Sequence, residues 1–175
     1  MYLINRCAIS KKELQEGDDV VHFPYYDAMP SEPEFICCED IALRSEFEKW
    51  QLRDRVIQKV RDFWIREYRD SVYFSILAEN EIILISKSYV EDSIRLFFLK
   101  YVFDVWLTED TWKRFQDFVT VEKGSIKLSE KESFSWNVDS AKGSVVLQKI
   151  EVRKDTIIVP ITEWQNLQEL LSTIR

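Results

Sequence analysis

Residues 155–175 read DTIIVPITEWQNLQELLSTIR, and this stretch carries the clearest structural signal in the chain. It begins with a short β-branched, apolar run and continues with apolar residues at helical spacing. The stretch therefore predicts a strand that leads directly into a helix. Pro160 suits the end of a strand or an edge, where its missing N–H costs no ladder bond. Thr162 is placed as the helix N-cap, with Gln165 three residues later.

A second stretch of this kind, DVWLTEDTWKRFQDFV, lies at residues 104–119. Both contain a tryptophan, an apolar residue three positions later, and then glutamine, an acid and another apolar residue. The members are Trp112, Phe115, Gln116, Asp117 and Phe118 in the first copy, and Trp164, Leu167, Gln168, Glu169 and Leu170 in the second. Aligning residues 93–96 with 144–147 brings the two tryptophans into step with one insertion. The pattern indicates an internal duplication; the alternative is convergence between ordinary strand-to-helix junctions.

Strand-like runs precede each predicted helix. Residues 72–77 and 82–85 flank Glu79 and Asn80, which predicts a hairpin. Residues 94–107 are apolar and aromatic, and periodicity alone does not separate strand from helix there, although the duplication favours strands. Further strands are predicted at residues 126–128, 134–138, 145–152 and 156–161. We therefore expect an α+β protein with two strand-rich antiparallel units, 71–124 and 125–175, each ending in a helix, as a possible β4α tandem repeat.

Residues 41–70 are predicted to form one long amphipathic helix. Its apolar stripe consists of Leu43, Phe47, Trp50, Ile57, Val60, Trp64 and Tyr68. Charged residues of both signs lie between these positions, as on a solvated helix face. At 1.5 Å per residue the helix would be roughly 40 Å long, so we expect it to lie across a sheet.

Residues 1–40 form an irregular segment that contains all three cysteines and the only histidine. Cys7-Ala8-Ile9-Ser10 and Cys37-Cys38-Glu39-Asp40 have the spacing of two zinc knuckles, each without its second cysteine. The segment thus resembles a degenerate treble-clef zinc module. This resemblance implies a zinc site made of Cys7, His22, Cys37 and Asp40. The alternative, which we favour, is that the cysteines are buried and pack as small hydrophobes.

Charge and missing motifs limit the function classes. The 31 acidic residues outnumber the 24 Lys and Arg residues, which gives a net charge of −7 and favours a basic protein partner over a phosphate backbone. The chain has no Gly-x-Gly-x-x-Gly, no Gly-Lys-Ser/Thr loop and no Gly-x-Ser-x-Gly elbow. A Cys–His nucleophile would have to use His22, and the sequence supplies no orienting third group. We expect a non-enzymatic binding or regulatory protein, such as an inhibitor or immunity-type partner of a basic protein.

The predicted order of four strands and a helix, twice over, is similar in outline to the Whirly and Pur families of single-strand nucleic-acid binders. This resemblance covers residues 71–175 and implies an alternative function in nucleic-acid binding. The candidate residues are Lys127, Phe134, Trp136, Lys149 and Arg153, with the two aromatic rings as a stacking platform for bases. The acidic net charge counts against this function, and such an aromatic pair more often lines a core.

No part of the sequence approaches the roughly 18 consecutive apolar residues that a membrane helix needs. Residues 1–10 show no signal-peptide pattern. Three sparse cysteines suit a reducing compartment better than a disulfide framework. We therefore expect a soluble, cytoplasmic protein that forms one compact unit, has a protein partner and makes no contact with a membrane.

Overall fold

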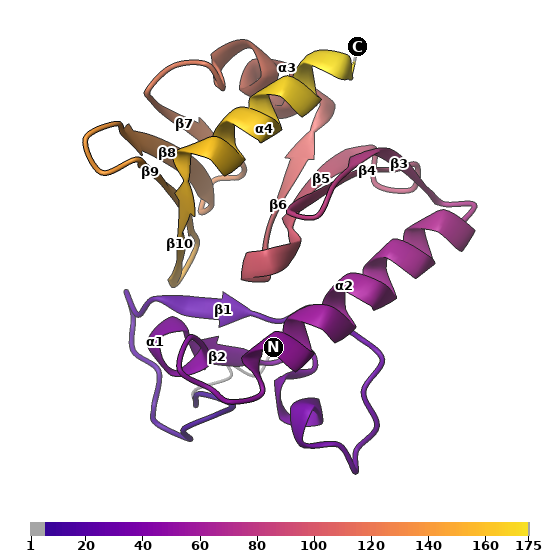
Figure 1. The fold of residues 1–175 in the computed structure, drawn as a ribbon, viewed down its shortest axis with the longest axis vertical. Helices are drawn as coiled ribbons and strands as arrows, with labels where there is room; N and C mark the ends of the chain where they lie inside the picture. The colour runs from indigo at the N-terminus through magenta and orange to yellow at the C-terminus, as the bar shows by residue number, and fades with distance from the viewer. Residues whose placement is uncertain (1–5, 175) are drawn as a thin grey trace.

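The computed structural model describes residues 6–174. Figure 1 shows the N-terminal segment at the base, a long helix rising from it, and two sheets above with two helices across their upper ends. The predicted α+β architecture is confirmed, with two antiparallel four-stranded sheets that are each followed by a helix. No helix within residues 6–174 is long and apolar enough to cross a membrane.

The N-terminal segment is built around a small hairpin. Its elements are β1 (Val20–His22), η1 (Pro33–Cys37), β2 (Ile41–Leu43) and α1 (Arg44–Phe47). β1 and β2 are antiparallel, with Val20 opposite Leu43. The rings of Phe23 and Phe47 meet edge to face at 5.0 Å and join the hairpin to α1. The segment predicted to be irregular therefore contains a short strand just before Pro24.

The single helix predicted over residues 41–70 is wrong at its start. Residues 41–52 form β2, α1 and a turn, and the long helix is α2 (Arg53–Asp70). Its 18 residues span about 27 Å. Pairing with β1 satisfies the backbone of residues 41–43, and the N–H of Trp50 donates to the carbonyl of Phe47 in the turn. The apolar stripe is real, but three separate elements supply it to one core.

The first unit follows α2. It contains β3 (Phe74–Glu79), β4 (Ile83–Ser88), β5 (Ser93–Phe98), η2 (Leu99–Tyr101), β6 (Phe103–Thr108) and α3 (Glu109–Phe118). The strands form an antiparallel meander in the order β3-β4-β5-β6, so residues 94–107 are mainly strand, as the duplication favours. Thr108 caps α3 by accepting the N–H of Thr111, and Glu109 and Asp110 lie in the first turn, where the helix dipole favours acids.

The second unit repeats this plan. It contains β7 (Lys123–Lys127), β8 (Ser133–Asp139), β9 (Ser144–Ile150), β10 (Lys154–Pro160) and α4 (Ile161–Thr173), with the strands again in meander order. Pro160 ends β10, as predicted. Thr162 is not the N-cap, because α4 already begins at Ile161. The N–H of Ile161 donates to the carbonyl of Gly143, which satisfies one of the N–H groups that have no partner within the helix.

The glutamines of the repeated motif make reciprocal bonds between α3 and α4. Gln116 Nε2 of α3 donates to the carbonyl of Ile174, which follows α4, at 3.1 Å. Gln168 Nε2 of α4 donates to the carbonyl of Val119, which follows α3, at 2.9 Å. Each unit therefore satisfies a carbonyl at the C-terminal end of the other unit's helix. This exchange relates the two units in an approximately twofold manner.

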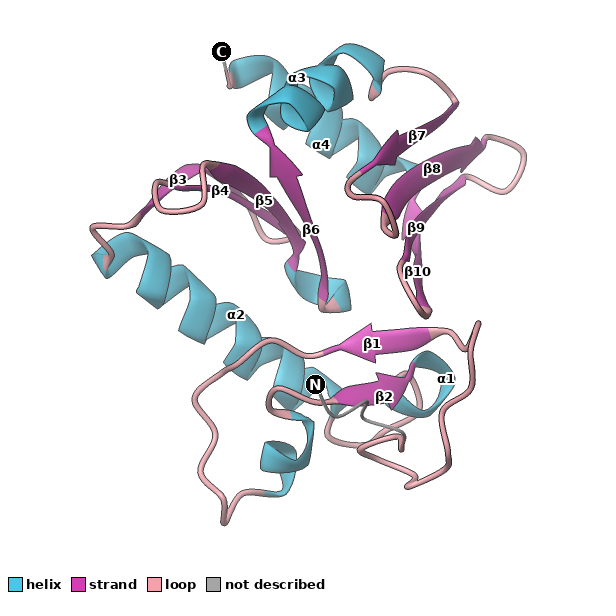
Figure 2. Cartoon of the chain, turned by 180° about the vertical axis from the view of Figure 1, so that it is seen from behind, coloured by secondary structure: helices cyan, strands magenta, loops and turns pink. Residues whose placement is uncertain are grey.

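The first sheet separates two apolar cores. Its inner face, including Leu96 and Val105, packs with α3, α4 and the second sheet. Its outer face, including Leu84 and Phe97, packs on α2 and the N-terminal segment. Figure 2 shows α2 running beneath this sheet, whereas none of the helices described covers the corresponding outer face of the second sheet. The two units thus share a plan but differ in what covers their outer faces.

Candidate functional site

The residues predicted to bind zinc do not form one site. Cys7 and Cys37 have no solvent exposure, as the favoured alternative requires. The thiol of Cys7 accepts the N–H groups of Ser10 and Leu43, each at 3.4 Å. Burial acts to raise the pKa of Cys7, but these hydrogen bonds outweigh it and the pKa is lowered. Burial, followed by the charges of Asp40 and Cys7, raises the pKa of Cys37 to about 12.

His22 lies in a different electrostatic environment from the cysteines. Burial lowers its pKa, and the nearby charges of Lys149, Glu151 and Asp104 modify it further. Within the described part of the chain, no group of three or more His, Cys, Asp or Glu side chains is arranged to hold a metal ion. The arrangement therefore does not fit the zinc site implied by the treble-clef spacing.

The proposed stacking platform faces the interior. Phe134 and Trp136 are almost fully buried and pack on Phe115 of α3. The Trp136 ring lies against the backbone of Gly124, where an added Cβ would come within 2.0 Å of ring atom Cζ2. Its Nε1 donates to the carbonyl of Val121 at 3.0 Å. Neither ring is available to stack on a base, so the core interpretation of this pair is correct.

The three basic candidates for nucleic-acid binding also point in different directions. Lys127 is exposed on the outer face of β7. Lys149 points inward, with its Nζ 3.9 Å from Asp104 and 3.7 Å from Glu132. Arg153 lies in the turn between β9 and β10 and is half-buried. These residues and the two aromatic rings do not share one surface.

A buried arginine, Arg95, lies at the centre of a polar and aromatic cluster. The guanidinium of Arg95 lies between the rings of Trp64 and Phe97, at 4.3 and 4.2 Å from their centroids. It donates to Asp104 Oδ2 from Nε and to the hydroxyl of Tyr68 from Nη1, both at 2.8 Å. Burial acts to raise the pKa of Asp104, but Arg95, followed by Lys149, outweighs it, so the pKa is lowered.

This cluster is closed rather than open to a ligand. Arg95 is 2% exposed, and its partners come from α2, β5 and β6. Desolvated cation–π contacts and charge-assisted hydrogen bonds of this kind are strong. Sequence periodicity did not single out Arg95, because an arginine in an apolar run reads as an interruption. Its contacts indicate that it fixes α2 on the first sheet.

An exposed apolar surface lies at one end of the first sheet. Val72, Tyr73, Tyr89 and Val90, here called the tyrosine patch, are 82, 60, 60 and 71% exposed. The N–H of Tyr89 donates to the carbonyl of Tyr73 at 2.9 Å, so the two short segments are adjacent. The Tyr89 hydroxyl donates to Ser75 Oγ at 3.0 Å and holds the ring along β3. Exposed groups of large apolar side chains mark interaction sites, and tyrosine is enriched in them.

Acidic residues surround the tyrosine patch. Asp70 precedes it at the end of α2, and Glu91 and Asp92 follow it in the turn before β5. All three are exposed. The nearby Lys87 is already engaged, since its Nζ lies 2.7 Å from Glu109 and 3.5 Å from Asp92. The patch therefore combines an apolar centre with a negative rim. The sequence alone does not reveal the tyrosine patch, because Val72 and Tyr73 fit the start of an ordinary hairpin strand.

Comparisons with known proteins assign no function to this surface: no family model, curated protein or solved structure matches the chain.

Proposed function

We propose that the chain is a non-enzymatic protein-binding or regulatory module that binds a basic partner through the tyrosine patch. The observation that carries this proposal is the grouping of two tyrosines and two valines, each at least 60% exposed, at one end of the first sheet. Aromatic anchors of this kind contribute most of the binding energy in many interfaces. The acidic rim and the net charge of −7 both favour a basic partner.

Site-specific photocrosslinking tests this function. A benzoylphenylalanine at position 89 should form an adduct with one defined basic protein in native lysate, and Val90→Asp should abolish the adduct. The matched control places the same crosslinker at Val152, which is 56% exposed on the second unit. We expect no equivalent adduct from position 152. A lysate that yields no adduct from position 89 above the unirradiated background contradicts the proposal.

One observation supports single-strand nucleic-acid binding as a second candidate function. Pairing and alternation put Lys123, Lys127 and Lys154 on the outer face of the second sheet. None of the three forms an ion pair within residues 6–174, and the only carboxylate on that strand face, Asp139, pairs with Lys142. The rest of the face is mixed: Ser125, Ser135, Asn137 and Gln148 line a hollow of about 530 Å³. The apolar side chains of Val146, Ile150 and Ile158 lie on the same face.

Fluorescence anisotropy with a labelled oligothymidylate tests this second function. Binding at low salt should weaken as salt rises, because phosphate contacts release counterions. Lys127→Glu should weaken it further, while Lys49→Glu, which alters an exposed lysine in the turn before α2, should change it less. An oligonucleotide that does not bind at low salt removes this function from consideration.

A further inference from the structure

The strand β3 is an open edge of the first sheet. It comes first in the strand order β3-β4-β5-β6 and, within residues 6–174, pairs only with β4. Every residue from Phe74 to Ala78 is partly exposed, whereas β5 is buried along its whole length. Apart from Ser75 the run is apolar, and its first charged residue is Glu79. Exposed apolar edges of this kind can pair with another strand.

The pairing register shows which backbone groups of β3 point outward. The bond from the Tyr89 N–H to the Tyr73 carbonyl makes Tyr73 and Tyr89 a hydrogen-bonded pair. Such pairs alternate along an antiparallel ladder, so Ser75 also faces β4. The N–H and C=O groups of Phe74 and Ile76 therefore face the open side. These two residues are two positions apart, which is the repeat that an added strand needs.

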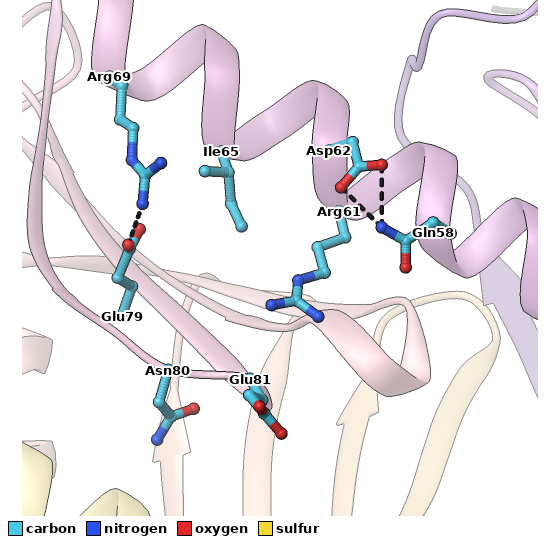
Figure 3. A pocket seen from close by; sticks show the side chains of 8 residues that line it. All are labelled: Gln58, Arg61, Asp62, Ile65, Arg69, Glu79, Asn80 and Glu81. Atoms are coloured by element: carbon cyan, nitrogen blue, oxygen red, sulfur yellow. Dashed lines mark hydrogen bonds and ion pairs between the residues drawn. The ribbon is translucent and has the colours of Figure 1, made fainter.

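A groove flanks the other end of β3 (Figure 3). Gln58, Arg61, Asp62 and Arg69 of α2 face Glu79 and Glu81 at the β3–β4 turn across a volume of about 490 Å³. Arg69 is paired with Glu79, and Gln58 Nε2 donates to both carboxylate oxygens of Asp62, at 2.8 and 2.9 Å. The Arg61 side chain reaches toward the turn. The open edge thus runs from the tyrosine patch to a polar groove.

The charges along this edge favour a basic occupant. Asp70 and Glu91 lie by the patch and Glu81 lies by the groove, and none of them has an ion-pair partner within the described residues. Arg61 is the one base of the groove that is likewise unpaired there. Three free carboxylates against one free guanidinium give the edge an excess of negative charge. A peptide that carries lysine or arginine would complement it.

We propose that an extended, basic segment of a partner protein adds to β3 as a fifth strand of the first sheet. The segment bonds to the outward backbone groups of Phe74 and Ile76, lays one end on the tyrosine patch and extends its other end into the groove beside α2. Main-chain bonds supply affinity in such strand addition, and side-chain pockets supply specificity. The inference rests on the proposed protein-binding function and identifies the conformation and charge of the partner segment.

A second copy of the chain is a poorer occupant. Antiparallel pairing of β3 with β3 of another copy would bring Asp70 and Glu91 of one molecule toward Glu79 and Glu81 of the other. Opposed like charges penalise an incorrect partner. The edge is therefore complementary to a basic segment rather than to itself.

Peptide selection tests strand addition directly. A phage-displayed library of random 12-residue peptides is selected on the full chain, and the best peptide is then synthesised. We expect alternating sequences rich in Lys and Arg. Ile76→Pro removes an outward N–H at an edge, where proline is tolerated, and should weaken binding of the peptide at least tenfold. Ser125→Pro removes the corresponding outward N–H from β7, the edge of the other sheet, and should leave binding unchanged.

A ligand-side change keeps the test valid if Ile76→Pro folds poorly. Methylating the backbone nitrogens at the centre of the peptide removes the N–H donors of the strand bonds, so it should also weaken peptide binding at least tenfold. The protein itself is unaltered in this measurement. Equal binding by the methylated peptide, or no enrichment of any peptide, overturns strand addition. The inference also fails if the wild-type chain dimerises and Ile76→Pro makes it monomeric, since the occupant is then a second copy.

The outcomes separate this inference from the proposed function. If crosslinking at position 89 captures a basic protein and Ile76→Pro leaves that complex intact, the patch binds through side chains alone. Strand addition is then wrong, while the proposed function stands. If position 89 captures no protein, the proposed function itself fails.

Discussion

At the scale of single residues, Asp155 links folding to pH. Its Oδ1 accepts from Nη2 of Arg44 at 2.5 Å, and both side chains are almost fully buried. Burial raises the pKa of Asp155 to about 6 even though Arg44 acts in the opposite direction. The folded protein therefore holds this proton more tightly than the unfolded chain, where the pKa is about 3.9. The resulting stabilisation is complete below that value and is lost as pH rises through about 6.

We predict that Asp155→Asn removes this fall in stability between about pH 4 and pH 6. Each pKa unit corresponds to about 1.4 kcal/mol of unfolding free energy, so the change in slope is measurable. Asn also removes the buried counter-ion of Arg44, which keeps only the longer pair with Glu48 at 3.5 Å, so the variant should be less stable overall. Urea unfolding at a series of pH values measures both effects.

His22→Gln is the matched control for the pH series. Burial lowers the pKa of His22, so this residue contributes stability above about pH 6.5 that is lost as pH falls, which is the opposite sign. If the wild-type and Asp155→Asn curves run parallel between pH 4 and pH 6, the assignment to Asp155 is wrong.

Single residues also show where prediction from sequence stops. The alternation of Phe134 and Trp136 correctly placed both rings on one strand face. It did not settle whether that face was covered, because Phe115 and Trp164, which pack on Trp136, come from helices of both units. The burial of a strand face depends on long-range packing that one strand's sequence does not contain.

At the scale of elements, the reciprocal bonds of Gln116 and Gln168 give a physical reason for the repeated tryptophan–glutamine motif. The succession of strands and helices along residues 71–175 followed from periodicity together with the duplication. The start of the long helix did not, because Leu43, Phe47 and Trp50 fit helical spacing while β1 supplied a partner strand for residues 41–43. Local spacing is satisfied by either structure, and tertiary pairing decides between them.

We predict that Gln116→Ala and Gln168→Ala each destabilise the protein by about 1 kcal/mol, the usual net contribution of a hydrogen bond. Each substitution leaves a carbonyl at the end of the other unit's helix without its partner. Gln165→Ala is the control, because Gln165 is an exposed glutamine of α4, the helix that also contains Gln168. Chemical denaturation compares the three. Equal losses from Gln165→Ala and Gln168→Ala would show that helix propensity, not the reciprocal bond, sets the cost.

At the scale of the whole molecule, the two faces of the first sheet belong to two different apolar cores. Leu84 belongs to the core on the α2 side and Leu96 to the core between the two units, although they lie on adjacent strands. Arg44 adds a second link, since it joins α1 to Asp155 of β10 and to the carbonyl of Tyr101. Neither core can be lost without exposing a face of the sheet that supports the other.

We predict one cooperative unfolding transition for the whole chain. Tryptophan fluorescence and far-UV circular dichroism should give superimposable urea curves. Leu84→Ala and Leu96→Ala should each cost about 2–5 kcal/mol and shift both signals together. Separate transitions, or a Leu84→Ala effect confined to one signal, would show that the N-terminal segment and α2 unfold independently.

The tyrosine patch could not be predicted at any of these scales. Val72 and Tyr73 fit the start of a hairpin strand whether that strand end is buried or exposed. Its exposure here arises because α2 ends at Asp70, just before the patch, while α3 and α4 pack elsewhere on the sheet. What leaves a surface open is a property of neighbouring elements.

The register shift in β3 has a consequence for fibre growth. An open apolar edge normally invites open-ended polymerisation, in which each new molecule offers the next one a fresh template. In β3 the pairing with β4 shifts by one residue between Ile76 and Ala78, so the regular edge ends there. The part of β3 that can pair regularly with an incoming strand is therefore only a few residues long, and Glu79 follows the register shift. The molecule can keep this edge open for a partner and still resist stacking into filaments.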